Sequence, residues 1–68
     1  MTIEQIRLKE TRLARGYTQA EIAEKLGVTQ QAYQKLETGR TTDMRISTVK
    51  RICQVFDISA DWLLGLKE

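Results

Sequence analysis

The stretch TQAEIAEKLGVTQQAYQKLE, residues 18–37, restricts the fold more than any other part of the chain. Thr18 can cap a helix, and Glu21 three residues later completes a capping box. Gly27 ends this helix, because glycine readily takes the left-handed conformation that follows a helix. Two residues later Thr29 can cap a second helix. Two helices joined by so short a glycine turn must cross steeply, at about 90–120°.

Helix signals continue on both sides of this stretch, and strand-like alternation of apolar residues is absent. Thr2 can cap a first helix, which Gly16 ends. A fourth helix is expected to begin between residues 43 and 47, and Ser59 can cap a short fifth one. We therefore predict an all-α fold, a compact five-helix domain with a central helix-turn-helix at about 18–37. At 68 residues the chain, 1–68, is expected to be a single domain.

Apolar residues recur at helical spacing and are expected to supply the core of so small a domain. Cys53 lies within one such stretch, VKRICQVF, and is interpreted as a buried structural thiol rather than a reactive one. The expected core positions are Ile3, Ile6, Leu8, Leu13, Ile22, Ala23, Leu26, Ala32, Tyr33, Leu36, Ile46, Val49, Ile52, Cys53, Phe56, Trp62, Leu63 and Leu64.

Composition argues against several classes of function. One cysteine and no histidine leave no disulfide and no metal-ligand cluster, and we expect no cofactor. The residues present form no nucleophile, base and orienting group in sequence, so an enzyme is not expected. No apolar run approaches the roughly 20 residues of a membrane span, and no signal peptide is visible. We expect a soluble intracellular protein.

Charge is unevenly distributed along the chain. The net charge is only +2, from 11 basic and 9 acidic residues. Residues 29–51 contain five basic and two acidic side chains, whereas residues 52–68 contain one basic and three acidic ones. A basic middle favours a polyanionic partner over a merely solvated surface, although only modestly.

The helix expected after Thr29 has two unlike sides. At about 100° per residue, Ala32, Tyr33 and Leu36 fall on one side, which is suited to packing. The other side carries three amides and one cation: Gln30, Gln31, Gln34 and Lys35. Glutamine on a helix surface is commonly just solvated. It can also pair in bidentate fashion with adenine in the major groove, and free N–H groups at a capped helix start favour a phosphate.

The sequence resembles the lambda-repressor-like helix-turn-helix family, the Cro/C1 (XRE) type of phage and bacterial regulators. The resemblance covers nearly the whole chain and is strongest in YTQAEIAEKLGVTQQAYQKLETGR, residues 17–40, with support from VFDISADWLL, residues 55–64. It implies that the protein acts in a bacterial cytoplasm or a phage-infected host, that double-stranded DNA is the partner and that the helix after Thr29 reads base edges. The base-reading residues would be Gln30, Gln31, Lys35 and Gln34. The phosphate-binding residues would be Thr18, Gln19, Thr29, Thr38, Gly39, Arg40 and Thr42.

The same resemblance implies structural roles. Arg12 and Glu37 correspond to an ion pair that ties two helices together, although Arg12 could instead face a phosphate. A homodimer interface would lie on the last two helices, with Phe56, Ile58 and Trp62 as candidates. Tyr33 departs from the family, which usually has Ile or Val there; its bulk could tilt the helix, or its hydroxyl could reach a phosphate.

We predict a sequence-specific DNA-binding transcriptional regulator, a repressor that binds a near-palindromic operator as a dimer. The alternative is an antitoxin-type autoregulator or a protein-interaction module whose main partner is another protein.

Overall fold

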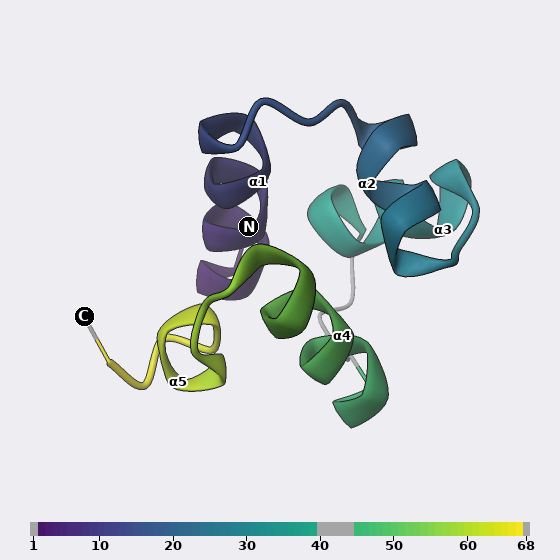
Figure 1. Ribbon diagram of the computed structural model, residues 1–68. Helices are drawn as coiled ribbons and strands as arrows, with labels where there is room; N and C mark the ends of the chain where they lie inside the picture. Colours follow the sequence, from purple (N-terminus) through teal and green to yellow (C-terminus); the bar gives the residue numbers. More distant parts are fainter. Residues whose placement is uncertain (1, 40–44, 68) are drawn as a thin grey trace.

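The computed structural model describes residues 2–39 and 45–67, which form five helices and, within those ranges, no strand. These are α1 (Ile3–Ala14), α2 (Gln19–Leu26), α3 (Gln30–Thr38), α4 (Ile46–Phe56) and α5 (Ala60–Leu63), shown in Figure 1. The predicted all-α, five-helix fold is confirmed. None of the described helices has both the length and the apolar character needed to cross a membrane.

Side-chain caps explain where most of the helices begin. The hydroxyls of Thr2, Thr18, Thr29 and Ser59 each accept a hydrogen bond from a backbone N–H three residues later. Such a cap stabilises a helix by about 1 kcal/mol. Thr2 and Thr18 form complete capping boxes, with Gln5 and Glu21 as their respective partners.

The turn between α2 and α3 depends on glycine. Gly27 has a φ of 72° and a ψ of 29°, which is the left-handed conformation. Its N–H donates to carbonyls in the last turn of α2, and the N–H of Val28 donates to the carbonyl of Ala23. Ala23 is 2% exposed, so a small side chain lies where α2 packs against its neighbours. The chain therefore reverses within two residues, and α3 packs against α2.

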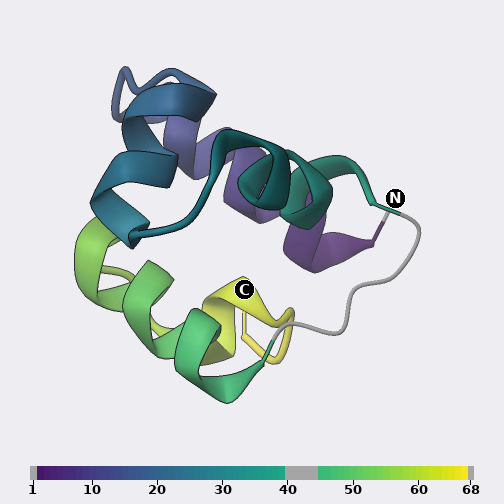
Figure 2. The same ribbon diagram turned by 90° about the vertical axis from the view of Figure 1, so that its right-hand side faces the viewer.

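A single apolar core joins the helices. Helix α1 packs against α3 and α5, α2 against α3 and α4, and α4 against α5. In Figure 2 the first three helices lie on one side of the molecule, with α4 and α5 on the other. The buried apolar residues are Leu8, Ile22, Ala23, Leu26, Tyr33, Val49, Ile52, Phe56 and Leu63.

Helix α1 begins and ends as expected, but three of its four expected core residues are not buried. Ile3, Ile6 and Leu13 are 42%, 39% and 57% exposed, and Leu8 is the apolar residue of α1 that is fully buried. The buried side of α1 is otherwise polar, with Gln5, Thr11 and Arg12 all buried. Gln5 and Arg12 bind the end of α3 through a hydrogen bond and an ion pair, whereas the hydroxyl of Thr11 donates to the carbonyl of Arg7 within α1. Two other expected core residues, Ala32 and Ile46, are exposed as well.

Candidate nucleic-acid interface

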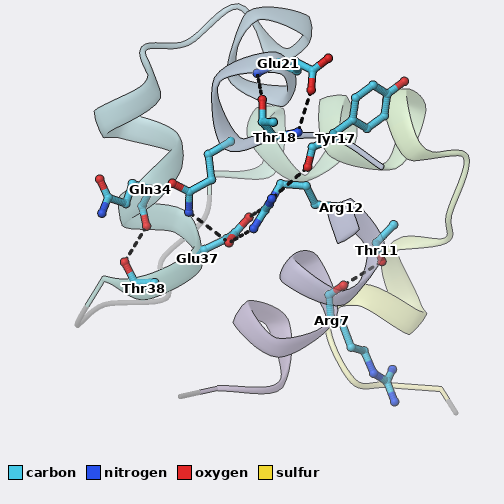
Figure 3. Close-up of polar contacts among 10 residues, drawn as sticks. Arg7, Thr11, Arg12, Tyr17, Thr18, Glu21, Gln34, Glu37 and Thr38 are labelled. Atoms are coloured by element: carbon cyan, nitrogen blue, oxygen red, sulfur yellow. Dashed lines mark hydrogen bonds and ion pairs between the residues drawn. The ribbon is translucent and has the colours of Figure 1, made fainter. Parts of the chain in front are cut away.

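Helix α3 turns one side to the core and the other to solvent. Tyr33 and Glu37, one helical turn apart, are both 0% exposed. The four side chains expected to read bases, Gln30, Gln31, Gln34 and Lys35, are all exposed. Figure 3 shows the side chain of Gln34 on the opposite side of α3 from Arg12, which approaches from α1. A partner could therefore reach these four residues without any rearrangement of the core.

The outer side of α3 carries no negative charge. Glu37 is the one carboxylate in the sequence of α3, and it is completely buried. What remains exposed is a row of amides, which can donate and accept, together with the ammonium group of Lys35. This combination suits a surface that carries both hydrogen-bonding edges and negative charge.

Arg12 of α1 holds the buried carboxylate in place (Figure 3). Its Nε donates to Oε2 of Glu37 at 2.6 Å, and its Nη2 donates to Oε1 at 3.2 Å. The remaining nitrogen, Nη1, donates to the carbonyl of Tyr17 at 2.9 Å. The guanidinium is therefore occupied by protein groups and only 9% of the Arg12 side chain is exposed, which favours a structural role over a phosphate contact.

Gln19, at the first residue of α2, completes this cluster by donating from Nε2 to Oε1 of Glu37 at 3.4 Å. Burial by itself raises the pKa of Glu37. The hydrogen bonds from Arg12 and the positive charge of Arg12 lower it by more, so the pKa of Glu37 lies below its usual range. The hydrogen bond to Glu37 likewise raises the pKa of Arg12 against the opposing effect of burial. Both groups are charged at neutral pH.

Tyr33 does not reach a phosphate, contrary to one of the two interpretations of this residue. Its side chain is fully buried, and its hydroxyl makes no hydrogen bond to any described residue. Burial raises the pKa of Tyr33 far above its usual range, and the nearby carboxylate of Glu37 raises it further. The hydroxyl is therefore a buried, neutral group in the middle of α3.

The expected phosphate-binding residues differ in which hydrogen-bonding groups they still offer. The hydroxyls of Thr18 and Thr29 accept from backbone N–H groups, so each keeps its own proton to donate. The hydroxyl of Thr38 already donates to the carbonyl of Gln34 at 2.9 Å. Gln19 uses one of its two amide protons on Glu37. Arg40 and Thr42 lie outside the described residues.

The sequence analysis missed two side-chain hydrogen bonds to the ends of α2 and α3. Gln5 donates from Nε2 to the carbonyl of Gly39, at the end of α3, at 2.7 Å. Arg51 of α4 donates to the carbonyl of Leu26, at the end of α2, at 3.4 Å. A signal for Gln5 was present, since Thr2-x-x-Gln5 has capping-box spacing. No local pattern points to Arg51, because its partner is 25 residues away.

The residues expected at a dimer interface are not equally accessible. Phe56 is 0% exposed and belongs to the core, so its assignment to an interface is corrected. Ile58 and Trp62 are partly buried, and the ring of Trp62 lies 4.7 Å from the guanidinium carbon of Arg7. A mainly apolar groove lies instead between α4 and α5, lined by Ile46, Val49, Lys50, Cys53, Gln54, Ala60 and Leu64.

Cys53 is half-buried in this groove, and burial raises the pKa of its thiol, so the thiolate is disfavoured. Among the residues that the structure describes, no three His, Cys, Asp or Glu side chains lie together in a way that could hold a metal ion.

Two capped helices joined by a glycine turn, with the second one presenting a polar surface, define a helix-turn-helix protein. A sequence profile described as Helix-turn-helix matches residues 8–63, and the chain belongs to this family, in its Cro/C1 type.

Two curated relatives are similar over most of the chain. The chain is 36% identical over 58 residues to the SPbeta prophage-derived uncharacterized HTH-type transcriptional regulator YonR of Bacillus subtilis (strain 168), which covers 85% of this chain and 53% of the relative. It is 32% identical over 62 residues to the HTH-type transcriptional regulator SinR of Bacillus licheniformis, which covers 91% of this chain and 56% of the relative. The chain thus spans about half the length of these relatives.

Proposed function

We propose that this chain binds double-stranded DNA in a sequence-specific way and acts in transcription regulation as a repressor. The observation that carries the proposal is the outer side of α3, which offers three amides and a lysine while its one carboxylate is buried against Arg12. DNA presents base edges with hydrogen-bonding groups between two rows of phosphates, which matches that surface. Both relatives are named as HTH-type transcriptional regulators, which agrees with this proposal.

In this proposal α3 enters the major groove with its first turn foremost. Gln30 and Gln31 then meet base edges, and Gln34 and Lys35 lie one turn further along. The free protons of the Thr18 and Thr29 hydroxyls, each at the start of a helix, face phosphates on the two sides of the groove. Thr38 contributes less to such a contact, because its hydroxyl proton already donates to the carbonyl of Gln34 within the helix.

The size of the domain favours binding as a dimer. The domain measures 28 × 25 × 21 Å along its principal axes, and each copy has a single α3 to place in a groove. Successive major grooves on one face of DNA are about 34 Å apart, so a single copy does not span two of them. Two copies related by a two-fold axis would read a near-palindromic operator. The apolar groove between α4 and α5 is the surface we assign to their contact.

Selection of bound sequences from a random DNA pool tests the base-reading role. We expect one half-site to be enriched, and the affinity for it to fall steeply as salt increases. Gln30→Ala and Gln31→Ala form a matched pair. Each should remove preference at a different base pair, with a loss of discrimination of about 1–3 kcal/mol. A pool that shows no enrichment, or variants that leave every preference unchanged, would refute the proposal.

Sedimentation with and without the selected site tests the dimer. Ile46, which lines the groove, is 76% exposed, and Leu13 on α1 is 57% exposed. Ile46→Gln should weaken cooperative binding of two copies, whereas Leu13→Gln should not. Equal effects of the two variants, or a complex that contains one copy on a complete operator, would contradict the assigned interface.

A further inference from the structure

Ala32 differs from the other exposed residues of α3, because its side chain has no polar group. It is the third residue of the helix and is exposed, although apolar periodicity placed it in the core. The two residues before it, Gln30 and Gln31, are exposed amides. The first turn of α3 therefore presents one methyl group next to two amides.

The backbone of Ala32 offers no donor to a partner. Its N–H already donates to the hydroxyl oxygen of Thr29 at 3.1 Å, in the hydrogen bond that caps the helix. Its carbonyl points toward the next turn of α3, away from the start of the helix. The methyl group is thus the part of Ala32 that a partner can contact.

The position of Ala32 around α3 places this methyl group at the edge of the polar surface. At about 100° per residue, Ala32 lies about 60° from Lys35 and about 100° from Gln31. The side chains of Tyr33 and Glu37, which are fully buried, define the opposite side of the helix. A partner that covers Gln31 and Lys35 together therefore also covers the methyl group of Ala32.

The major groove of DNA contains an apolar group that such a methyl can contact. Donors and acceptors make up most of the pattern that the base pairs present there, and thymine adds its C5-methyl group. Contact between an alanine side chain and this methyl group buries apolar surface and favours thymine over other bases.

We propose that Ala32 is a specificity-determining residue, which reads a thymine by contact with its C5-methyl group. The inference rests on the proposed function, in which α3 enters the major groove, and deepens it. The amides of Gln30 and Gln31 recognise hydrogen-bonding groups, whereas Ala32 recognises an apolar one in the same half-site. The sequence analysis missed this role because it placed Ala32 on the packed side of α3.

Replacement of thymine by uracil in the DNA tests the contact directly. Uracil lacks only the C5-methyl group, so its hydrogen-bonding groups are those of thymine. Each thymine of the selected half-site is replaced in turn, and the affinity is measured by titration. We expect one replacement to weaken binding of the unaltered protein about fourfold, which is the effect of burying one methyl-sized group.

Ala32→Gly removes the methyl group from the protein side of the contact. This variant should bind the thymine and the uracil site with nearly equal affinity. Any loss of folded protein lowers binding to both DNAs alike, so the ratio of the two affinities is independent of stability. Ala20→Gly, the same change at an exposed residue in the first turn of α2, is the matched control and should keep the fourfold ratio.

Three results would overturn the role of Ala32. The selected half-site could contain no A·T pair, or uracil could have no effect at any of its positions. The effect of uracil could also persist undiminished in Ala32→Gly, which would mean that another side chain reads the methyl group. If the unaltered protein selects no sequence at all, the proposed function itself fails.

Discussion

Helix α1 meets α3 through polar groups, whereas α4 meets α5 through apolar ones. The first junction contains a buried carboxylate with two hydrogen bonds from Arg12, and the amide of Gln5 on a backbone carbonyl. The second is part of a core in which Ile52, Phe56 and Leu63 are each 0% exposed.

The two junctions differ in what they can specify. Burial of apolar surface is favourable but has no direction, so the second junction supplies stability. A hydrogen bond adds only about 1 kcal/mol net, but it is satisfied in one geometry alone. The polar junction therefore orients α3, the helix that we propose enters DNA, while the apolar junction keeps the domain folded.

The largest effect is expected at the apolar junction. Phe56→Ala should reduce the free energy of unfolding by about 4 kcal/mol, because it removes a fully buried ring and leaves a cavity. A domain of this size has only roughly 3–10 kcal/mol in total, so much of the protein should be unfolded at 37 °C. Urea denaturation provides the measurement. Ile46→Ala, at an exposed position of the same helix, should change stability by less than about 0.5 kcal/mol.

The polar junction should respond differently to single and double changes. Arg12→Met leaves Glu37 buried without its partner and should cost about 3 kcal/mol. In the double variant Arg12→Met/Glu37→Leu no charge remains to be compensated. The loss should then fall to about 1 kcal/mol, because apolar residues of similar size can replace a buried pair.

Measuring the DNA affinity of this double variant tests whether the polar junction orients α3. If the ion pair orients α3, binding to the selected site should fall about tenfold or more even though the domain stays folded. If the double variant kept full stability and full affinity, the apolar core alone would be enough to orient α3. A double variant that loses as much stability as Arg12→Met would contradict the difference between the two junctions.

Acid should weaken the polar junction before the apolar one. The folded-state pKa of Glu37 is lowered, so its contribution to stability is present above its unfolded pKa, about 4.3, and is lost as the pH falls through the lower folded value. The pKa of Glu21 is also lowered, by hydrogen bonds within the Thr18 capping box. Denaturation at a series of pH values should show a flatter acid limb for the Arg12→Met/Glu37→Leu variant and a smaller change for Glu21→Gln. Identical acid limbs for the double variant and the unaltered protein would exclude a contribution from Glu37.

Local signals in the sequence were enough to predict most of the fold. The caps at Thr2, Thr18, Thr29 and Ser59 and the turn at Gly27 depend on residues within four positions of one another, and the structure contains all of them. The same spacing argument predicted the exposure of Gln30, Gln31, Gln34 and Lys35 and the burial of Tyr33, but it wrongly placed Ala32 on the packed side of α3. The base-reading and phosphate-binding roles remain predictions.

The polar side of α1 was missed because it depends on contacts between distant residues. The buried side of α1 is polar because it faces Glu37 and Gly39, which are 25 and 34 positions from their partners. Apolar periodicity could therefore not find it. Phe56 was assigned to an interface because the family resemblance implied one on the last two helices, and the sequence does not separate an apolar residue of the core from one on a surface.

Tyr33 gives the smallest expected effect and the finest test of the polar junction. Its hydroxyl is buried without a hydrogen bond among the described residues, although it lies close to the pair formed by Arg12 and Glu37. A buried hydroxyl without a partner is unfavourable, so Tyr33→Phe should leave stability unchanged or raise it by up to about 1 kcal/mol. DNA binding should be unaffected, because the ring still fills its place in the core. The matched control is Tyr17→Phe. The ring of Tyr17 is partly buried, and its centroid lies 6.2 Å from that of Phe56. If Tyr33→Phe instead lost more than about 0.5 kcal/mol, the hydroxyl would have to be part of the Arg12 and Glu37 network, and the polar junction would extend into the middle of α3.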